Sequence, residues 1–191
     1  MYGAAMTIMF FKFRLQTYFM ADRKTFLRNI IIGAAVIALP KFSFSQTKKR
    51  DKLSDTVVQE FVGQAHKDLA AVKKLHAKYP TLLNAAWDWG GGDFETALGA
   101  ASHVGYMELI NYLLESGAQM NFLTLCVLGK TEMVNQLLKQ YPYLLNMKGP
   151  HGFTPLHHAI RGGENALEVK KLLEGLGAKE TKILLAFPEG K

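Results

Sequence analysis

The stretch Thr154-Pro155-Leu156-His157-His158-Ala159 decides the fold of this 191-residue chain. Thr154 carries a side-chain oxygen that can cap a helix, and Pro155 suits the first helical position, where an N–H has no intrahelical acceptor. Leu156 and Ala159 then lie on one side of the helix, and both are small enough for close packing against a neighbour. The stretch therefore predicts a short, capped helix that stacks on another helix.

The same pattern recurs elsewhere in the chain, which makes it a repeat. Residues 96–105 (TALGAASHVG) align without a gap to residues 154–163. Copies of the helix that follows this pattern lie at residues 67–75, 108–114, 129–138 and 168–173. The phrase Tyr-Pro-x-Leu-Leu-Asn also occurs twice, at residues 79–84 and 141–146.

These copies in register resemble the ankyrin-repeat family from about Asp55 to the C-terminus. The resemblance implies an all-α solenoid of about four helix-pair units with short β-turn fingers, in which each unit contacts only its neighbours. It also implies that the protein binds a protein or peptide through its concave face and fingers. Because such scaffolds serve many partners, the resemblance does not identify this one. We expect a monomer.

Residues 20–45 have the three parts of an export signal. Three basic residues lie between positions 23 and 28, residues 30–39 form an apolar run, and Ser43-Phe44-Ser45 favours cleavage ahead of Gln46. The basic start is similar to a twin-arginine motif with lysine at the second arginine, so ordinary secretory export is an equal alternative. A permanent anchor is the other alternative, which the short apolar core disfavours. We expect an exported protein, in the periplasm or cell envelope.

The remaining segments complete the predicted organisation. Residues 1–19 are interpreted as an upstream extension, with translation starting at Met20, or alternatively as a membrane-surface segment. Residues 46–55 are interpreted as a polar linker, and residues 56–191 as the ankyrin-repeat domain. Membrane contact is expected only through an uncleaved signal.

The distribution of charge along the chain argues against nucleic acid as a partner. The whole chain has a formal net charge of +7, but residues 46–191 hold 17 basic and 15 acidic residues, so most of the excess lies in the leader. The repeat region has no sustained basic stripe of the kind that phosphate binding needs, and we expect no nucleic-acid partner. Cys126 is the only cysteine, which excludes an internal disulfide and indicates a small core residue.

Two fingers are expected to frame a notch. The first finger, residues 85–95, contains both tryptophans and three consecutive glycines; the second finger is Lys148–Gly152. Gly105 and Gly129 are only 24 residues apart, less than the roughly 33 residues of a full unit, so the intervening unit lacks a finger. This gap leaves a notch between the two fingers.

Residues around the notch are the candidate site. The predicted partner-binding residues are Trp87, Asp88, Trp89, Asp93, Phe94, Glu95, His103, His151 and Phe153. Loops on a rigid scaffold often carry function, which favours this interpretation. The alternative is a hairpin whose rings only pack on the neighbouring finger.

The sequence evidence for catalysis or metal binding is weaker than that for partner binding. The sequence contains no recognisable metal, nucleophile or phosphate-loop motif, so we expect no enzyme and no cofactor. His157 matches the signature histidine of the family, which implies a structural hydrogen bond between loops. The acids of the first finger, including Asp88, Asp93 and Glu95, nevertheless have the ligand types for a metal or for acid–base work if they converge with His103 and His151. A metal-binding or hydrolytic protein is therefore the alternative function.

Three finer expectations concern secondary structure and packing. Residues 57–63 and 65–76 are predicted to form the divergent first helix pair, and residues 181–187 a final capping helix. The leucines expected to face neighbouring helices are Leu98, Leu113, Leu137, Leu156 and Leu172.

Overall fold

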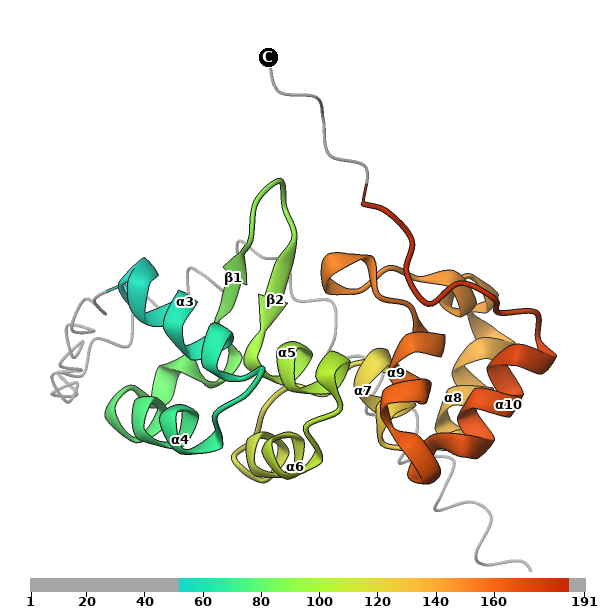
Figure 1. The fold of residues 1–191 in the computed structure, drawn as a ribbon, viewed down its shortest axis with the longest axis horizontal. Coiled ribbons are helices and arrows are strands. Elements are labelled where there is room, and N and C mark those ends of the chain that lie inside the picture. Colours follow the sequence, from blue (N-terminus) through green and yellow to red (C-terminus); the bar gives the residue numbers. More distant parts are fainter. Residues whose placement is uncertain (1–51, 186–191) are drawn as a thin grey trace, which may run out of the picture. The chain divides into compact units, whose positions relative to one another are not determined.

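The computed structural model describes residues 52–185, which contain eight α-helices and one two-stranded hairpin (Figure 1). The α-helices are α3 (Asp55–Gln64), α4 (Leu69–Lys78), α5 (Ala97–Val104), α6 (Met107–Glu115), α7 (Phe122–Val127), α8 (Thr131–Gln140), α9 (Pro155–Arg161) and α10 (Leu167–Gly175). The strands are β1 (Ala86–Asp88) and β2 (Phe94–Thr96), and the 3-10 helices are η1 (Pro80–Asn84), η2 (Pro142–Asn146), η3 (Pro150–Gly152) and η4 (Gly163–Ala166). The predicted extension, export signal and most of the linker lie outside the described residues.

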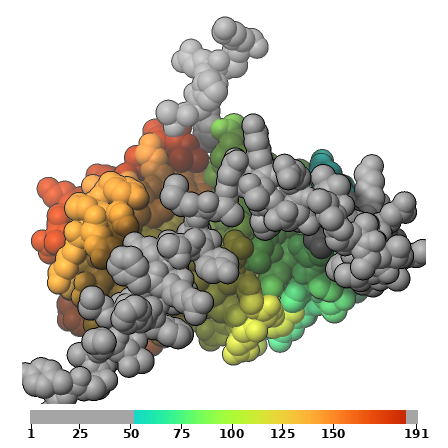
Figure 2. All heavy atoms as spheres, turned by 180° about the vertical axis from the view of Figure 1, so that it is seen from behind, coloured from blue at the N-terminus to red at the C-terminus, as the bar shows by residue number. Residues whose placement is uncertain are grey.

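The helices form consecutive pairs that stack in chain order. Helix α3 packs on α4, α5 on α6, α7 on α8, and α9 on α10. The first helices of the pairs also form a row, since α3 contacts α5, α5 contacts α7, and α7 contacts α9. In the space-filling view from behind, sequence colours succeed one another across the molecule from green to orange (Figure 2). The predominance of helices confirms the expected all-α class. None of the described helices has the length and apolar character needed to cross a membrane.

Five helices begin at a side chain that accepts a hydrogen bond from the first helical turn. These N-caps are Ser54, Asp68, Thr96, Asn121 and Thr154. Each satisfies one of the backbone N–H groups that a helix start leaves without an intrahelical acceptor. Between α6 and α7 the chain makes only a short turn that ends at the Asn121 cap, so no hairpin separates these two helices.

Two apolar clusters fill the space between the packed helices. The first joins α3, α5 and α6 around Phe61, Leu98 and Leu113, and the second joins α7 to α10 around Cys126 and Leu173. The prediction that Cys126 is a small core residue is confirmed, and burial raises the pKa of its thiol to about 12.

The predicted leucine positions hold in the first helices and in α6 but not in α8 and α10. Leu98, Leu113 and Leu156 are buried as expected. Leu137 and Leu172 are only half-buried, and the residues that follow them, Leu138 and Leu173, are buried instead. The core face of these two helices is therefore rotated by about one residue from the predicted register.

The first helix pair also differs from its prediction. Residues 65–76 do not form one helix, because the chain turns after α3 and α4 begins only at Leu69. The Asp68 side chain accepts a hydrogen bond from the Ala71 N–H at 2.9 Å, which fixes this later start. As a result, His66 lies in a turn rather than on a helix.

The predicted capping helix at residues 181–187 is wrong for its described part, residues 181–185. This segment contains no helix and pairs with the region of the second finger through an antiparallel bridge between Phe153 and Lys182. The Ile183 N–H donates to the Gly152 carbonyl at 2.8 Å. Gly152 permits the approach, because a Cβ at this position would overlap the Ile183 carbonyl oxygen.

The packing of α6 gives a direct test of the core. Leu113 is fully buried, so Leu113→Ala is expected to lower the free energy of unfolding by about 2–5 kcal/mol in urea melts. The matched control is Leu176→Ala, at a leucine that is half exposed, which should change it by less than about 0.5 kcal/mol. Equal effects of the two changes would show that the core is wrongly assigned.

The burial of His158 predicts that the folded protein loses stability in acid. It is buried, its Nδ1–H donates to the Thr154 carbonyl at 2.8 Å, and burial lowers its pKa to about 4. The unfolded chain, with a histidine pKa of about 6.5, therefore binds more protons between pH 6.5 and pH 4. We expect the native protein to lose about 2–3 kcal/mol more than His158→Asn on going from pH 7 to pH 4.5, since asparagine keeps the donor without titrating. Parallel losses in urea melts would contradict this.

Candidate metal centre

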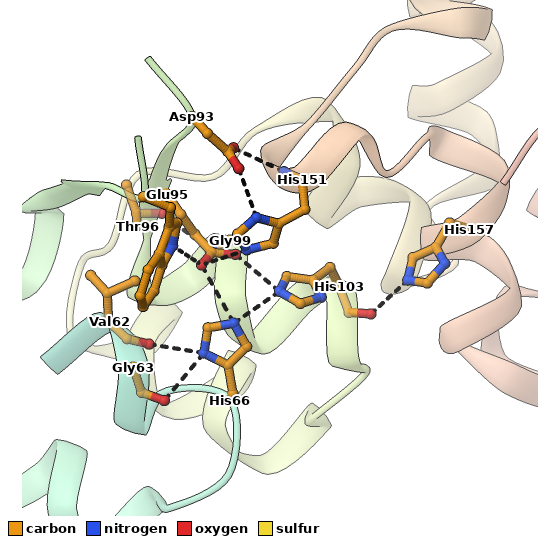
Figure 3. A network of polar contacts seen from close by, with 11 residues as sticks. Val62, Gly63, His66, Asp93, Glu95, Thr96, Gly99, His103, His151 and His157 are labelled. Atoms are coloured by element: carbon orange, nitrogen blue, oxygen red, sulfur yellow. Dashed lines mark hydrogen bonds and ion pairs between the residues drawn. The ribbon is translucent and has the colours of Figure 1, made fainter. Parts of the chain in front are cut away.

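Four side chains from separate segments converge on one point beside the first finger (Figure 3). They are His66 in the turn after α3, Glu95 on β2, His103 on α5 and His151 in η3 of the second finger. One nitrogen or carboxylate oxygen from each lies within 4.8 Å of those of the other three. Such a set has the ligand types and the proximity of a metal centre.

The first finger turns Glu95 toward this point. Asp88 Oδ1 accepts hydrogen bonds from the Gly90 and Gly92 N–H groups at 2.8 and 3.1 Å, which closes the hairpin tip. All three glycines of the tip have positive φ, a conformation that other residues adopt only with strain. In the resulting register Trp87 faces Glu95 across the strands, and pleating buries Glu95 while Phe94 points outward.

Glu95 is a buried carboxylate whose hydrogen bonding is incomplete. It is 1% exposed, and its Oε2 accepts a hydrogen bond from the Trp89 indole N–H at 2.8 Å. Its Oε1 has no hydrogen-bond partner within the described part of the chain, and His103 Nε2 lies 3.0 Å away from it. Burial raises the pKa of Glu95, but contact with His103, the Trp89 N–H and the charge of His66 together outweigh it and lower the pKa. The carboxylate is therefore ionised at neutral pH.

His66 directs its Nε2 lone pair at this carboxylate. Its Nδ1 lies 3.2 Å from both the Val62 and Gly63 carbonyl oxygens, which only accept hydrogen bonds. Nδ1 must then carry the proton, so in the neutral ring Nε2 is a lone pair. This Nε2 is 3.4 Å from Glu95 Oε2.

His151 is held in the same tautomer by Asp93. The Asp93 carboxylate accepts hydrogen bonds from His151 Nδ1–H at 2.7 Å and from the His151 backbone N–H at 2.9 Å. His151 Nε2 is thus also a lone pair in the neutral ring, 3.4 Å from Glu95 Oε2. The residue adopts φ 57°, which costs a non-glycine residue about 1–2 kcal/mol, and the two bonds to Asp93 stabilise this conformation.

His103 completes the cluster and is oriented from the opposite side. Its Nε2 lies 3.0 Å from His66 Nε2, and its ring stacks on Phe153 with 5.0 Å between centroids. The His157 Nε2–H donates to the His103 backbone carbonyl at 2.8 Å, which is visible at the right of Figure 3. His157 thus makes a structural hydrogen bond, but the bond joins α9 to the last turn of α5, whereas a bond between loops was expected. Burial lowers the pKa of His157, which keeps the ring neutral.

The cluster is electrostatically incomplete with neutral rings alone. The Nε2 lone pairs of His66 and His151 both lie 3.4 Å from Glu95 Oε2, and that of His66 also accepts a hydrogen bond from His103 Nε2–H at 3.0 Å. A proton shared within the cluster removes the electrostatic repulsion at one of the two contacts with Oε2. A divalent cation at the centre removes the repulsion at both of them. Four separations within the cluster, measured to one or the other Glu95 oxygen where that residue takes part, are 3.0–3.4 Å, and one ligand atom from each residue lies within 4.8 Å of the others, close enough to share one ion.

The predicted site residues divide into three groups. The structure brings together four of them, Asp93, Glu95, His103 and His151, and all but His151 are buried, so these three offer little surface to a partner. Phe153 and Trp89 support the cluster by stacking and hydrogen bonding. Trp87, Asp88 and Phe94 do not join it: Trp87 packs against the first apolar cluster, Asp88 closes the hairpin tip, and Phe94 is 62% exposed.

Sequence reasoning missed His66. The residue was placed inside a predicted helix of the most divergent unit, where no motif marks it. Its proximity to His103 depends on the turn that ends α3 and on the packing of α3 against α5. The only sequence signal is its position two residues before the capping residue Asp68.

Comparison with known proteins adds no assignment: no protein-family model matches the chain, and no curated protein matches it significantly.

Proposed function

We propose that this protein binds one divalent transition-metal ion, of the zinc class, through His66, Glu95, His103 and His151. The observation that carries the proposal is the buried Glu95 carboxylate: its Oε1 has no hydrogen-bond partner among the described residues, and three imidazoles converge on its two oxygens, His103 on Oε1 and the other two on Oε2. An ionised group that is buried without full compensation is costly, and a bound cation offsets that cost.

The outer contacts of the ligands support the same conclusion. Histidines that ligate a metal usually donate their second N–H to a carbonyl or carboxylate, which fixes the tautomer and the ring orientation. His66 does so to the Val62 and Gly63 carbonyls, and His151 does so to Asp93. Three imidazoles with one carboxylate favour zinc, copper, iron or nickel over calcium and magnesium, which take mainly oxygen ligands.

The scaffold is proposed to be an ankyrin-like solenoid. Its support is the sequence repeat together with four helix pairs that stack in chain order. On this scaffold the ion connects the first, second and fourth pairs, because the third contributes no finger. Export of the chain, argued from residues 20–45, is likewise a proposal.

Metal titration of purified native protein tests the proposal. Isothermal titration with Zn²⁺ is expected to give one site, and His103→Ala is expected to weaken it beyond the roughly 10–100-fold loss typical of an outer contact. Asp93→Asn, which changes such an outer contact, should lie within that range. The matched control is His76→Ala, which removes a part-buried histidine that bonds Tyr112 outside the cluster, and it should leave the affinity unchanged.

Two results would contradict the proposal. One is the absence of a saturable site in the native protein. The other is an equal loss of affinity in His76→Ala and His103→Ala, which would indicate general binding to histidines. Circular dichroism of each variant separates ligand loss from unfolding.

Recognition of a protein or peptide is a second candidate function, which the notch favours. A pocket of about 340 Å³ lies between the fingers, lined by Phe94 and Thr96 on one side, Met147 and Pro150 on the other, and Leu123 of α7 between them. It lies beside the short connection between α6 and α7, where no hairpin intervenes. Phe94 is 62% exposed at its edge, as expected for an aromatic contact.

Peptide-library selection on the native protein tests this second function. A selected peptide should lose at least roughly tenfold in affinity on Phe94→Ala, as for an interface hot spot. Tyr143→Ala is the control, because Tyr143 is also strongly exposed but lies on η2, away from the notch. Equal binding by both variants would place recognition elsewhere. Because Trp89 and Asp93 support the metal cluster, variants at those residues do not separate the two functions.

A further inference from the structure

The imidazoles of the cluster are not evenly spaced. The ring centroids of His66 and His103 are 4.9 Å apart, and those of His103 and His151 are 5.5 Å apart. The third separation, between His66 and His151, is 6.5 Å. The cluster is therefore widest on the edge between His66 and His151.

The same edge faces solvent. The side chains of His66 and His151 are 25% and 27% exposed, whereas those of His103 and Glu95 are 9% and 0% exposed. Trp89, which is 39% exposed, stands beside the edge, with its ring 6.3 Å from His66 and 6.1 Å from His151. His103 and Glu95 thus form the closed floor of the cluster, and the wide edge is its solvent side.

From this asymmetry we infer that an ion held by the four residues has a further coordination position, between His66 and His151, that binds solvent and exchanges it for a small monoanion. The inference rests on the proposed metal function and gives it a ligand class. Purely structural zinc sites are closed by four protein ligands, whereas centres that act on ligands keep a position for water or substrate.

Charge decides which ligand suits this position. A divalent ion with one Glu95 carboxylate in its first shell keeps one net positive charge, because the three imidazoles are neutral. A single small anion neutralises that charge, whereas a multiply charged anion overcompensates it beside the Asp93 carboxylate, which contacts His151. Metal-bound solvent at such a position is also more acidic than free water, which makes it a candidate nucleophile at neutral pH.

Cobalt(II) substitution of the native full-length protein tests the inference, with sodium azide as the probe. The visible spectrum is expected to show the weak bands of a centre with more than four ligands. Azide should shift these bands in a saturable manner. The positive control is His66→Ala, which removes one ligand and so creates an exchangeable position. Metal-free protein with azide gives the background.

The outcomes separate the inference from the function on which it rests. Intense tetrahedral bands that azide leaves unchanged in the native protein, while it shifts those of His66→Ala, would overturn the inference and leave metal binding intact. Failure of the native protein to bind either Co²⁺ or Zn²⁺ would overturn both. If His66→Ala does not retain Co²⁺, isothermal titration of azide into Zn²⁺-loaded native protein decides: saturable heat supports the exchangeable position, and its absence contradicts it.

Discussion

An ionised carboxylate buried in the first finger is the constraint on which the site depends. Glu95 is 1% exposed and retains its charge at neutral pH. Taking such a group out of water is costly unless cations or donors surround it. The Trp89 indole N–H donates to Oε2, which His66 and His151 also approach, and His103 lies beside Oε1. These side chains are arranged as ligands around a cation would be.

The stacking of helix pairs explains how such distant residues meet. Stacked helix pairs place the turn after α3, the start of β2, the α5 helix and the second finger on adjoining units. Because the third unit has no finger, Asp93 of the first finger reaches His151 of the second directly. His157 of α9 then fixes the backbone of His103 through a hydrogen bond to its carbonyl. The same hydrogen bond that joins two helices thus also orients a candidate ligand.

Features that depend on neighbouring residues were predicted from the sequence more completely than contacts between distant segments. The Thr154 cap and the burial of Leu156 follow from a local pattern, and the missing finger follows from the spacing of two glycines; all three are confirmed. The convergence of Glu95, His103 and His151 was anticipated only as an alternative, because it depends on finger length. His66 was missed, since helix ends in a divergent unit depend on one capping aspartate.

The wrong capping helix has a similar cause. Residues 181–185 carry a helix-compatible sequence, but extended pairing with Gly152 and Phe153 satisfies their backbone groups instead. A long-range hydrogen-bond partner of this kind leaves no periodic signal in the sequence.

X-ray absorption at the zinc edge tests the central claim most directly. Purified native protein loaded with one equivalent of Zn²⁺ should show three imidazole ligands and at least one oxygen ligand, with first-shell distances of about 2.0–2.2 Å. A first shell without the multiple-scattering signature of several imidazoles would contradict the account, as it would place the ion elsewhere in the protein.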